Sequence, residues 1–197
     1  MSPQFWQRFE DDRVYPAILT DTHAAALPDG RTLPLPLRDF GTFAVAGLIA
    51  NQASFTVLDQ LAAWTASAAA PLAAEVVVGL PTLGHTVGAA VARALGHANW
   101  AAPFTTRKRW YDDALSALLS SITSPATGAN IARRMWLDPR LLPLLAGKRV
   151  LLVDDVISTG RSATAGLALL EAVGVVPVGL AVAMVQGALW RETWPET

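Results

Sequence analysis

Two adjacent aspartates, followed by a short run rich in hydroxyl groups, form the part of the sequence best suited to chemistry. Asp154 and Asp155 come directly after four apolar residues, and the segment 156–162 leads into the next element. Adjacent carboxylates accept hydrogen bonds from vicinal hydroxyls, and a Ser/Thr/Gly turn at a helix N-terminus presents backbone N–H groups to a phosphate. Together these features predict a binding site for a ribose 5-phosphate.

The turn after the acids supplies two kinds of donor. Gly160 lets the backbone approach a ligand closely, and Thr159 and Ser162 add hydroxyl groups. The residues expected to bind the substrate here are Val156, Ile157, Ser158, Thr159, Gly160, Arg161 and Ser162. A simpler interpretation is that the acids end a strand, Ser162 caps a helix and Arg161 faces solvent.

Apolar runs alternate with helical segments along the chain, and this pattern predicts the elements that hold the site. Strands are expected at 75–80, 99–106, 149–153 and 175–185, and helices at 86–95 and 160–173. The alternation is typical of an α/β protein with a doubly wound parallel sheet. Because ligands bind beyond the carboxyl ends of such strands, the segments expected around one crevice are 79–85, 106–108, 154–162 and 185–189.

The N-terminal region departs from this alternation. Four prolines fall between residues 14 and 37, and the sequence from Pro28 to Arg31 is typical of a turn that joins two short strands. Two Ala-rich helices are expected after it, at 41–50 and 54–69. The sequence therefore predicts a small N-terminal hood or hairpin segment, residues 1–38, and an α/β core, residues 39–197.

Composition excludes several other classes of protein. Of the 197 residues, 52% are apolar and 16% charged, which favours a compact fold over a disordered chain. The 15 Lys and Arg nearly balance 16 Asp and Glu, so no overall charge attracts the chain to nucleic acid or an anionic membrane. The lack of cysteine fits a reducing cytoplasm. Neither a membrane span nor a signal peptide is expected, because the longest apolar runs fall short of roughly 20 residues and the first residues are acidic and aromatic.

The stretch around the acids also resembles a known family motif. VLLVDDVISTGRSATAG is similar to the phosphoribosyl diphosphate motif of the type I phosphoribosyltransferases, in which an apolar strand, two acids and a Thr-Gly-x-Ser/Thr loop follow one another. From Tyr15 to Leu189 the order of segments resembles the purine branch, the adenine and xanthine phosphoribosyltransferases. The resemblance implies phosphoribosyl transfer from 5-phosphoribosyl diphosphate to a purine-type base, with release of pyrophosphate. It further implies a homodimer and a hood over the base.

The resemblance assigns roles to further segments. The turn 79–85 is similar to the family's pyrophosphate turn, which implies binding by Pro81, Thr82, Leu83 and Gly84. Many members carry Arg or Lys where this chain has Leu83, so the pyrophosphate would rely on backbone amides and Thr82. The residues taken as catalytic are Asp154, Asp155, Arg107 and Lys108, the last two because they resemble a family Arg-Lys pair near the diphosphate. Gln186 stands at a strand end where purine enzymes grip the base.

The implied reaction also indicates a cofactor. Departure of the diphosphate builds positive charge on the ribose and negative charge on the leaving group. Mg²⁺ that bridges diphosphate and ribose oxygens would neutralise the second charge, while keeping several waters and few protein ligands. Asp154 and Asp155 would then act through water or only through the sugar, so no direct metal ligand is assigned. Closure of the loop 109–127 would exclude water.

Other interpretations are open. The segment 79–86 spells Gly-x-x-x-x-Gly-His-Thr, but His85 stands where a P-loop needs Lys. A binding or regulatory protein that keeps the sugar-phosphate site without transfer chemistry also fits. Trp190 could stack on a base or pack in the core. His23, His85 and His97 lack metal-ligand spacing.

Overall fold

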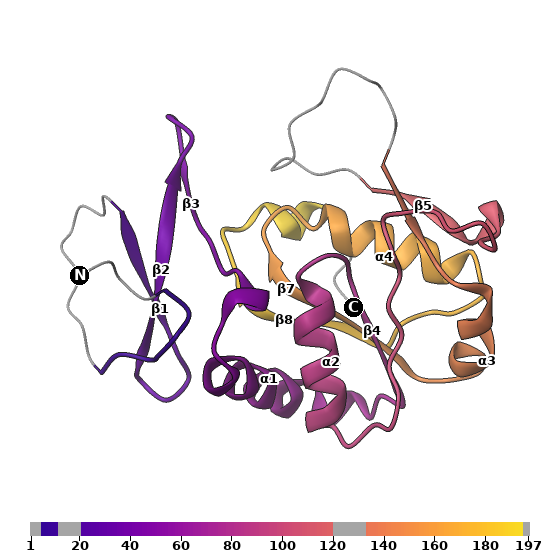
Figure 1. Ribbon diagram of the computed structural model, residues 1–197, viewed down its shortest axis with the longest axis horizontal. Helices are drawn as coiled ribbons and strands as arrows, with labels where there is room; N and C mark the ends of the chain where they lie inside the picture. Colours follow the sequence, from indigo (N-terminus) through magenta and orange to yellow (C-terminus); the bar gives the residue numbers. More distant parts are fainter. Residues whose placement is uncertain (1–4, 12–20, 120–132, 195–197) are drawn as a thin grey trace.

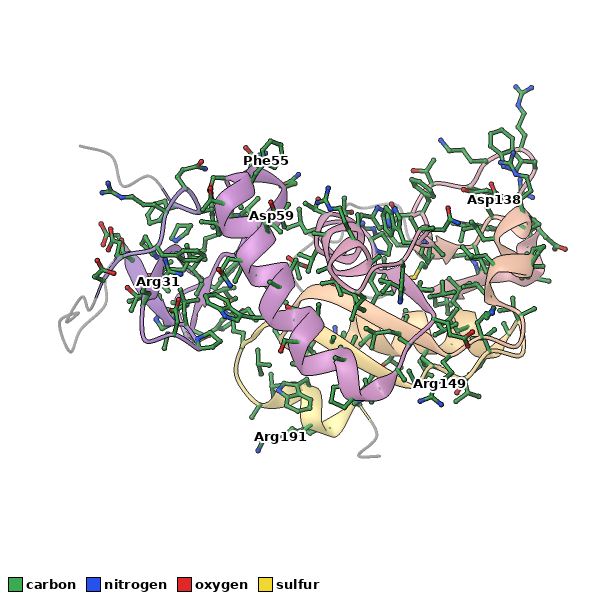
Figure 2. All side chains as sticks on the ribbon, turned by 90° about the horizontal axis from the view of Figure 1, so that it is seen from below. Arg31, Phe55, Asp59, Asp138, Arg149 and Arg191 are labelled. Carbon is green, nitrogen blue, oxygen red and sulfur yellow. The ribbon has the colours of Figure 1, made fainter. Side chains whose placement is uncertain are left out.

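The computed structural model describes residues 5–11, 21–119 and 133–194. These residues form an α/β unit beside a small antiparallel sheet, which lies at the left in Figure 1. Figure 2 shows Arg31, in the hairpin of the small sheet, at one end of the molecule and Asp138 at the other. None of the described helices is long and apolar enough to cross a membrane.

Three parallel strands build the central sheet, in the order β4, β7, β8. They span Val76–Gly79, Val150–Ile157 and Gly179–Val185 respectively. β7 is the middle strand, and its Val153 is paired with Gly79 of β4 on one side and with Ala181 of β8 on the other. The parallel sheet predicted from the apolar runs is confirmed.

Helices cover both faces of this sheet. α1 (Phe55–Ala69) and α2 (Gly84–Ala94) lie on one face, and α4 (Arg161–Glu171) lies on the other (Figure 1). Successive strand side chains point to opposite faces, so Leu151 packs in the core cluster of α1 and α2, whereas Leu152 packs in the cluster beneath α4. This two-sided arrangement confirms the doubly wound fold.

Shorter elements complete the chain. The remaining strands are β1 (Thr22–Ala26), β2 (Thr32–Asp39), β3 (Ala44–Ala46), β5 (Ser116–Leu118) and β6 (Arg134–Trp136). The remaining helical segments are η1 (Ala50–Gln52), η2 (Ala70–Leu72), η3 (Asp113–Leu115), η4 (Pro139–Leu141), α3 (Leu142–Leu145) and η5 (Leu189–Glu192).

The first three strands form the antiparallel sheet, which we call the hood. The loop 27–31 joins β1 to β2 as predicted, and the Leu27 N–H donates to the Arg31 carbonyl at 3.0 Å. β2 also pairs with β3, so the hood sheet continues to Ala46, past the boundary expected at residue 38. Leu35 of β2 belongs to one core cluster with Leu61 of α1, which attaches the hood to the core.

The structure departs from the predicted secondary structure in several places. Residues 41–50 are not a helix, because residues 44–46 pair with β2 and a 3-10 turn starts only at Ala50. The strand expected at 99–106 is reduced to single bridges at Ala101 and Phe104. Pro103 between them has no N–H to donate, and the chain leaves β4 there for β6. The β5–β6 hairpin was not expected.

Two glycines let α2 approach β4 closely. A side-chain carbon at Gly88 would lie 2.7 Å from the Cα of Gly79, and one at Gly79 would lie 2.9 Å from the carbonyl oxygen of Gly84. These neighbours are backbone atoms, which cannot rotate away as the end of a side chain would. The glycines therefore set how near the N-terminus of α2 comes to the carboxyl edge of the sheet.

We expect Gly88→Ala to lower the free energy of unfolding by about 2 kcal/mol. Overpacking costs up to about 3 kcal/mol, and the better helix propensity of Ala offsets about 1 kcal/mol. Urea unfolding measures the change. Gly47→Ala is the matched control, because its new carbon would lie 3.7 Å from the nearest atom. Equal stability of Gly88→Ala and the wild type would contradict the close-packing argument.

Candidate functional site

β7 carries the two acids beyond the end of its neighbour. β4 ends at Gly79, whereas β7 continues along β8 as far as Ile157. The strand expected at 149–153 is therefore longer than predicted, and Asp154 and Asp155 lie within it rather than after it. They still stand beyond the last residue of β4, at the carboxyl edge where doubly wound proteins bind ligands.

A cavity of about 540 Å³ opens at this edge, and we call it the main cavity. It lies between the hood, the turn after β4, the acids, the loop after β7 and the end of β8. Its lining residues are Phe43, Ala44, Val45, Ala46, Gly47, Leu48, Pro81, Thr82, Leu83, Leu119, Arg133, Asp154, Asp155, Val156, Ser158, Thr159, Arg161, Ser162, Gln186, Gly187 and Leu189. Both acids and most of the residues predicted to bind substrate are thus brought together.

A smaller cavity of about 40 Å³ lies within the loop after β7, and we call it the loop cavity. Ile157 and Gly160, which do not line the main cavity, line this one. Gly160 has a φ of +74° and precedes α4 without a side-chain cap, so Ser162 lies inside the helix instead of capping it. Among the described residues, no acceptor is found for the N–H groups of residues 158–160. The loop therefore offers amide donors at a helix N-terminus to a small anion.

Burial makes the acidic pair hard to ionise. Asp154 is only 7% exposed, and its Oδ1 accepts a hydrogen bond from the Asp155 N–H at 2.9 Å. Burial, and then the neighbouring charge of Asp155, raise the pKa of Asp154 well above its usual value. Burial also raises the pKa of Asp155, although hydrogen bonds from Asp154 and the backbone oppose it. The ligand-free pair therefore retains a proton above the usual aspartate range, mainly on Asp154.

The turn after β4 touches the acids directly. A side-chain carbon at Gly84 would collide with Oδ1 of Asp154, so only glycine fits at the start of α2. Pro81, Thr82 and Leu83 line the main cavity beside this contact, and the peptide bond between Pro81 and Thr82 is cis. The turn predicted to hold a pyrophosphate and the acidic pair thus lie side by side, which places them in one site.

Arg107 and Lys108 do not line either cavity. Nε of Arg107 lies 2.8 Å from Oδ1 of Asp113, and its guanidinium lies 5.5 Å from the centre of the Trp136 ring. Lys108 is exposed. Their catalytic role stays a prediction, because within the described chain they are not brought to the acids. Arg133 lines the main cavity without having been predicted to do so.

Several other lining residues were also missed from the sequence. Residues 43–48 were expected to be helical, and their place at the cavity depends on the pairing of β2 with β3. Leu119 and Arg133 flank residues outside the described part of the chain, and no sequence pattern marks them. The predicted loop 109–127 lies partly in that undescribed region, although its first part includes η3 and β5. Arg161, for which a solvent-facing position was an alternative, lines both cavities.

Gln186 links the sheet to the hood. Its Nε2 donates to the Ala46 carbonyl at 3.2 Å, and its backbone N–H donates to the Ile157 carbonyl at 2.9 Å. Since Ala46 belongs to β3, the side-chain bond holds the hood at a fixed distance from the end of β8. Gln186 also lines the main cavity, while its predicted contact with a base stays a prediction.

Two open interpretations are decided by packing. His85 Nε2 lies 2.7 Å from the Pro103 carbonyl oxygen, and burial lowers the pKa of this histidine. Its ring packs edge-on against Trp100 and Phe104, so it does not replace a P-loop lysine. Trp190 packs against the core beneath α4 and lines neither cavity.

No group of three or more metal-ligating His, Asp or Glu occurs in the described part of the chain.

The buried acids, the loop amides and the doubly wound sheet together define an α/β protein with a candidate ligand site at the carboxyl edge of its sheet. A family described as "Phosphoribosyl transferase domain" matches residues 45–193. The chain therefore belongs to the phosphoribosyltransferase family, as the motif resemblance indicated. This membership favours an enzyme over a non-catalytic binding protein.

Solved structures of adenine phosphoribosyltransferases share the fold. The one from Rhodothermus marinus is 21% identical with a TM-score of 0.60, covering 81% of this chain and 88% of that one. The one from Saccharomyces cerevisiae is 18% identical with a TM-score of 0.57, covering 89% and 90%. The one from Giardia lamblia is 17% identical with a TM-score of 0.56, covering 77% and 94%. A search of curated proteins finds no match.

We expect Asp154→Asn to raise the free energy of unfolding at neutral pH by about 1 kcal/mol, a usual gain when a functional site is relieved of strain. A carboxyl whose pKa is raised by folding holds its proton more tightly in the folded state. The wild type therefore loses stability as the pH rises from the unfolded pKa towards the folded one. The asparagine does not titrate, so its advantage should shrink towards pH 4.

Urea unfolding at pH 4.5 and pH 7.5, without Mg²⁺ or ligand, measures this difference. Asp59→Asn is the control, because the Asp59 carboxylate is exposed and lies 3.6 Å from Arg93 in a surface ion pair. If Asp154→Asn were less stable than the wild type at pH 7.5, the burial of a poorly ionised acid would not be the main effect at this position.

Proposed function

We propose that this phosphoribosyltransferase transfers phosphoribosyl from 5-phosphoribosyl diphosphate to a nitrogen of a purine-type base, with release of diphosphate. One observation carries the proposal: the buried acidic pair and the unbonded amides of the loop after β7 line two cavities that share Asp154, Ser158 and Thr159. Membership of the family supplies the reaction class. The purine acceptor and the role of each residue are the proposal's own steps.

The sugar phosphate binds along β7 and the loop after it. The 5-phosphate occupies the loop cavity, where the amides of residues 158–160 and the hydroxyls of Thr159 and Ser162 donate to its oxygens. Asp154 and Asp155 accept hydrogen bonds from the two ribose hydroxyls, since both carboxylates line the main cavity beside the loop. This division of roles accounts for the order of acids and loop in the sequence.

Transfer breaks the bond between C1 of the ribose and the diphosphate oxygen, and forms a bond from the acceptor nitrogen to C1. The diphosphate leaves with the electron pair, and the acceptor nitrogen gives up its proton to solvent. Backbone groups of residues 81–84 and the Thr82 hydroxyl bind the departing diphosphate. The acids favour positive charge on the ribose as the bond breaks, since carboxylates beside the sugar attract it.

The donor set fits Mg²⁺. Asp154 and Asp155 offer hard carboxylate oxygens, and no third acid or histidine joins them among the described residues. Mg²⁺ suits such a place, because it keeps several waters and binds one or two carboxylates together with phosphate oxygens. These two aspartates would act on the ion through water, and the ion, when bound, would neutralise charge on the diphosphate.

The acceptor binds at the hood end of the main cavity. The yeast structure is described as complexed with an imino-altritol bisphosphate and adenine, and the Giardia structure with 9-deazaadenine. In this chain Phe43 and the small apolar residues from Ala44 to Leu48 line the hood end, which suits a flat aromatic ring. Gln186 and hood backbone groups supply polar partners for its edge.

The proposal also includes cationic residues near the diphosphate, a homodimer and a cytoplasmic location. Arg107 and Lys108 serve as cations near the diphosphate, and Arg133 and Arg161 add positive charge from the cavity wall. A homodimer and a cytoplasmic location rest on the family resemblance and the sequence composition. Sedimentation of the purified protein measures the first, with a particle of twice the chain mass of 20.8 kDa expected.

We expect 5-phosphoribosyl diphosphate to bind the wild type in the presence of Mg²⁺, and Asp154→Asn/Asp155→Asn to weaken this binding about 100-fold. Two charge-assisted hydrogen bonds to the ribose hydroxyls are lost, each worth about 1.5 kcal/mol. Calorimetry with and without Mg²⁺ measures the affinity. Asp59→Asn/Glu171→Gln is the matched control, because it removes two exposed acids outside both cavities.

Release of pyrophosphate with adenine, hypoxanthine, guanine, xanthine and uracil as acceptors then tests the reaction. Release with a purine but not with uracil supports the proposal. Tight, Mg²⁺-dependent binding without transfer to any base would indicate a non-catalytic binding protein. A folded wild-type protein that does not bind 5-phosphoribosyl diphosphate would overturn the proposal.

Gln186→Leu is expected to raise the KM for the purine about tenfold, because it removes the bond that holds Ala46 of the hood near β8. The KM for 5-phosphoribosyl diphosphate should change less than about twofold, since the loop cavity is not lined by this residue. Steady-state kinetics with each substrate varied separately give both constants, and the exposed Gln52→Leu serves as control. Equal effects on both constants would contradict a role confined to the acceptor side.

A further inference from the structure

The last described turn of the chain contacts the loop after β7. Oγ1 of Thr193, the residue after η5, lies 2.7 Å from the carbonyl oxygen of Thr159 and donates to it. It also lies 3.1 Å from the Trp190 carbonyl oxygen. Among the described residues, no other donor to the Thr159 carbonyl is found. The hydroxyl of Thr193 is thus the contact that fixes this carbonyl.

Thr193 is held in place without help from the loop. Its own N–H and that of Trp194 both donate to the Trp190 carbonyl, at 3.1 Å and 2.9 Å. The rings of Trp190 and Trp194 pack against the core cluster beneath α4. The turn is therefore anchored in the core, and a rigid support of this kind can set the position of a neighbouring loop.

The bond to Thr159 determines where the next amide points. The peptide between Thr159 and Gly160 is trans, and the C=O and N–H of a trans peptide point in opposite directions. When the Thr159 carbonyl turns to Thr193, the Gly160 N–H must face the other way. The loop cavity is lined by Thr159 and Gly160 but not by Thr193, so it offers a place for this N–H to meet a ligand.

Close packing prevents the loop from moving towards the turn. A side-chain carbon at Gly160 would collide with Oγ1 of Thr193 and would lie 3.4 Å from the Trp190 carbonyl oxygen. Thr193 instead lines a separate surface groove with Ser116 and Thr164. It therefore contacts the loop without lining either cavity of the proposed site.

We propose that Thr193 is a positioning residue for the sugar-phosphate site: its hydroxyl holds the Thr159 carbonyl so that the Gly160 N–H is aimed at the 5-phosphate. This inference rests on the proposed function, because it assigns a support to the phosphate loop of that same site. Thr193 does not touch the substrate, and its effect is confined to ligands that carry the 5-phosphate.

The test compares Thr193→Val, which keeps the shape of the side chain but removes the hydroxyl, with Thr193→Ser, which restores it. Thr193→Val should weaken binding of 5-phosphoribosyl diphosphate and of ribose 5-phosphate about fivefold, the factor that corresponds to one hydrogen bond of ordinary strength. Inorganic pyrophosphate, which binds at residues 81–84, should bind as it does to the wild type. Thr193→Ser should bind all three ligands as the wild type does.

Thr164→Val is the matched control. Oγ1 of Thr164 also donates to a carbonyl of the loop, that of Gly160 at 3.0 Å, but the Thr164 backbone N–H already donates to the same oxygen at 2.8 Å. Removing this hydroxyl leaves the carbonyl held, so the affinity for ribose 5-phosphate should not change. Calorimetry on proteins with matched circular-dichroism melting curves measures each affinity.

The outcomes separate this inference from the function on which it rests. If the wild type binds 5-phosphoribosyl diphosphate and Thr193→Val binds it equally well, Thr193 does not position the loop. If Thr193→Val loses affinity for pyrophosphate to the same degree, the turn supports the fold in general and the inference fails. If the wild type binds neither sugar phosphate, the proposed function itself is wrong.

Discussion

The burial of two adjacent carboxylates at the edge of a parallel sheet is the constraint on which the rest of the site depends. Asp154 is almost fully covered, and no ion pair in the described chain involves either acid. Its carboxyl group has room only because Gly84 has no side chain. A buried acid without a cation tends to keep its proton, so the free protein holds its central groups in an unfavourable state. The surrounding core must be stable enough to offset this.

The lengths of the core strands determine where the two acids lie. β4 stops at Gly79 while β7 runs on beside β8, and this difference leaves the acids uncovered by β4 but still fixed by backbone pairing. Gly79 and Gly88 bring α2 against the end of β4, so its N-terminal turn meets Asp154. The turn after β4 and the loop after β7 consequently reach the same cavity. Small residues at the helix–strand contact thus determine the spacing of groups that would bind a ligand.

The sequence predicted what is encoded locally and failed where distant segments decide. The helix expected at 160–173 is confirmed as α4, and it is closed by Gly174, which has a φ of +73° and whose N–H donates to the Glu171 carbonyl, while the Val175 N–H donates to the Leu170 carbonyl. The loop after β7 was predicted as a binding loop because its residues follow one another in the sequence and so form a recognisable motif. β3 was mistaken for a helix, since alanine favours helices and only the pairing with β2 makes this stretch a strand. Arg133 reaches the main cavity through a long-range arrangement that no spacing reveals.

The protonation of the buried acids and the fixed amides of the loop after β7 are linked through the ligand that would bind both. An incoming ligand must supply what the protein lacks at Asp154 and Asp155, namely hydroxyl donors or a cation. In the proposed complex the 5-phosphate is the part for which the protein is already prepared, because the amides of the loop have no internal acceptor among the described residues. Preorganised donors lower the entropy lost on binding, and the anchored turn at Trp190 keeps one of them in place. Binding energy gained at the phosphate can therefore drive the deprotonation of the buried pair next to it.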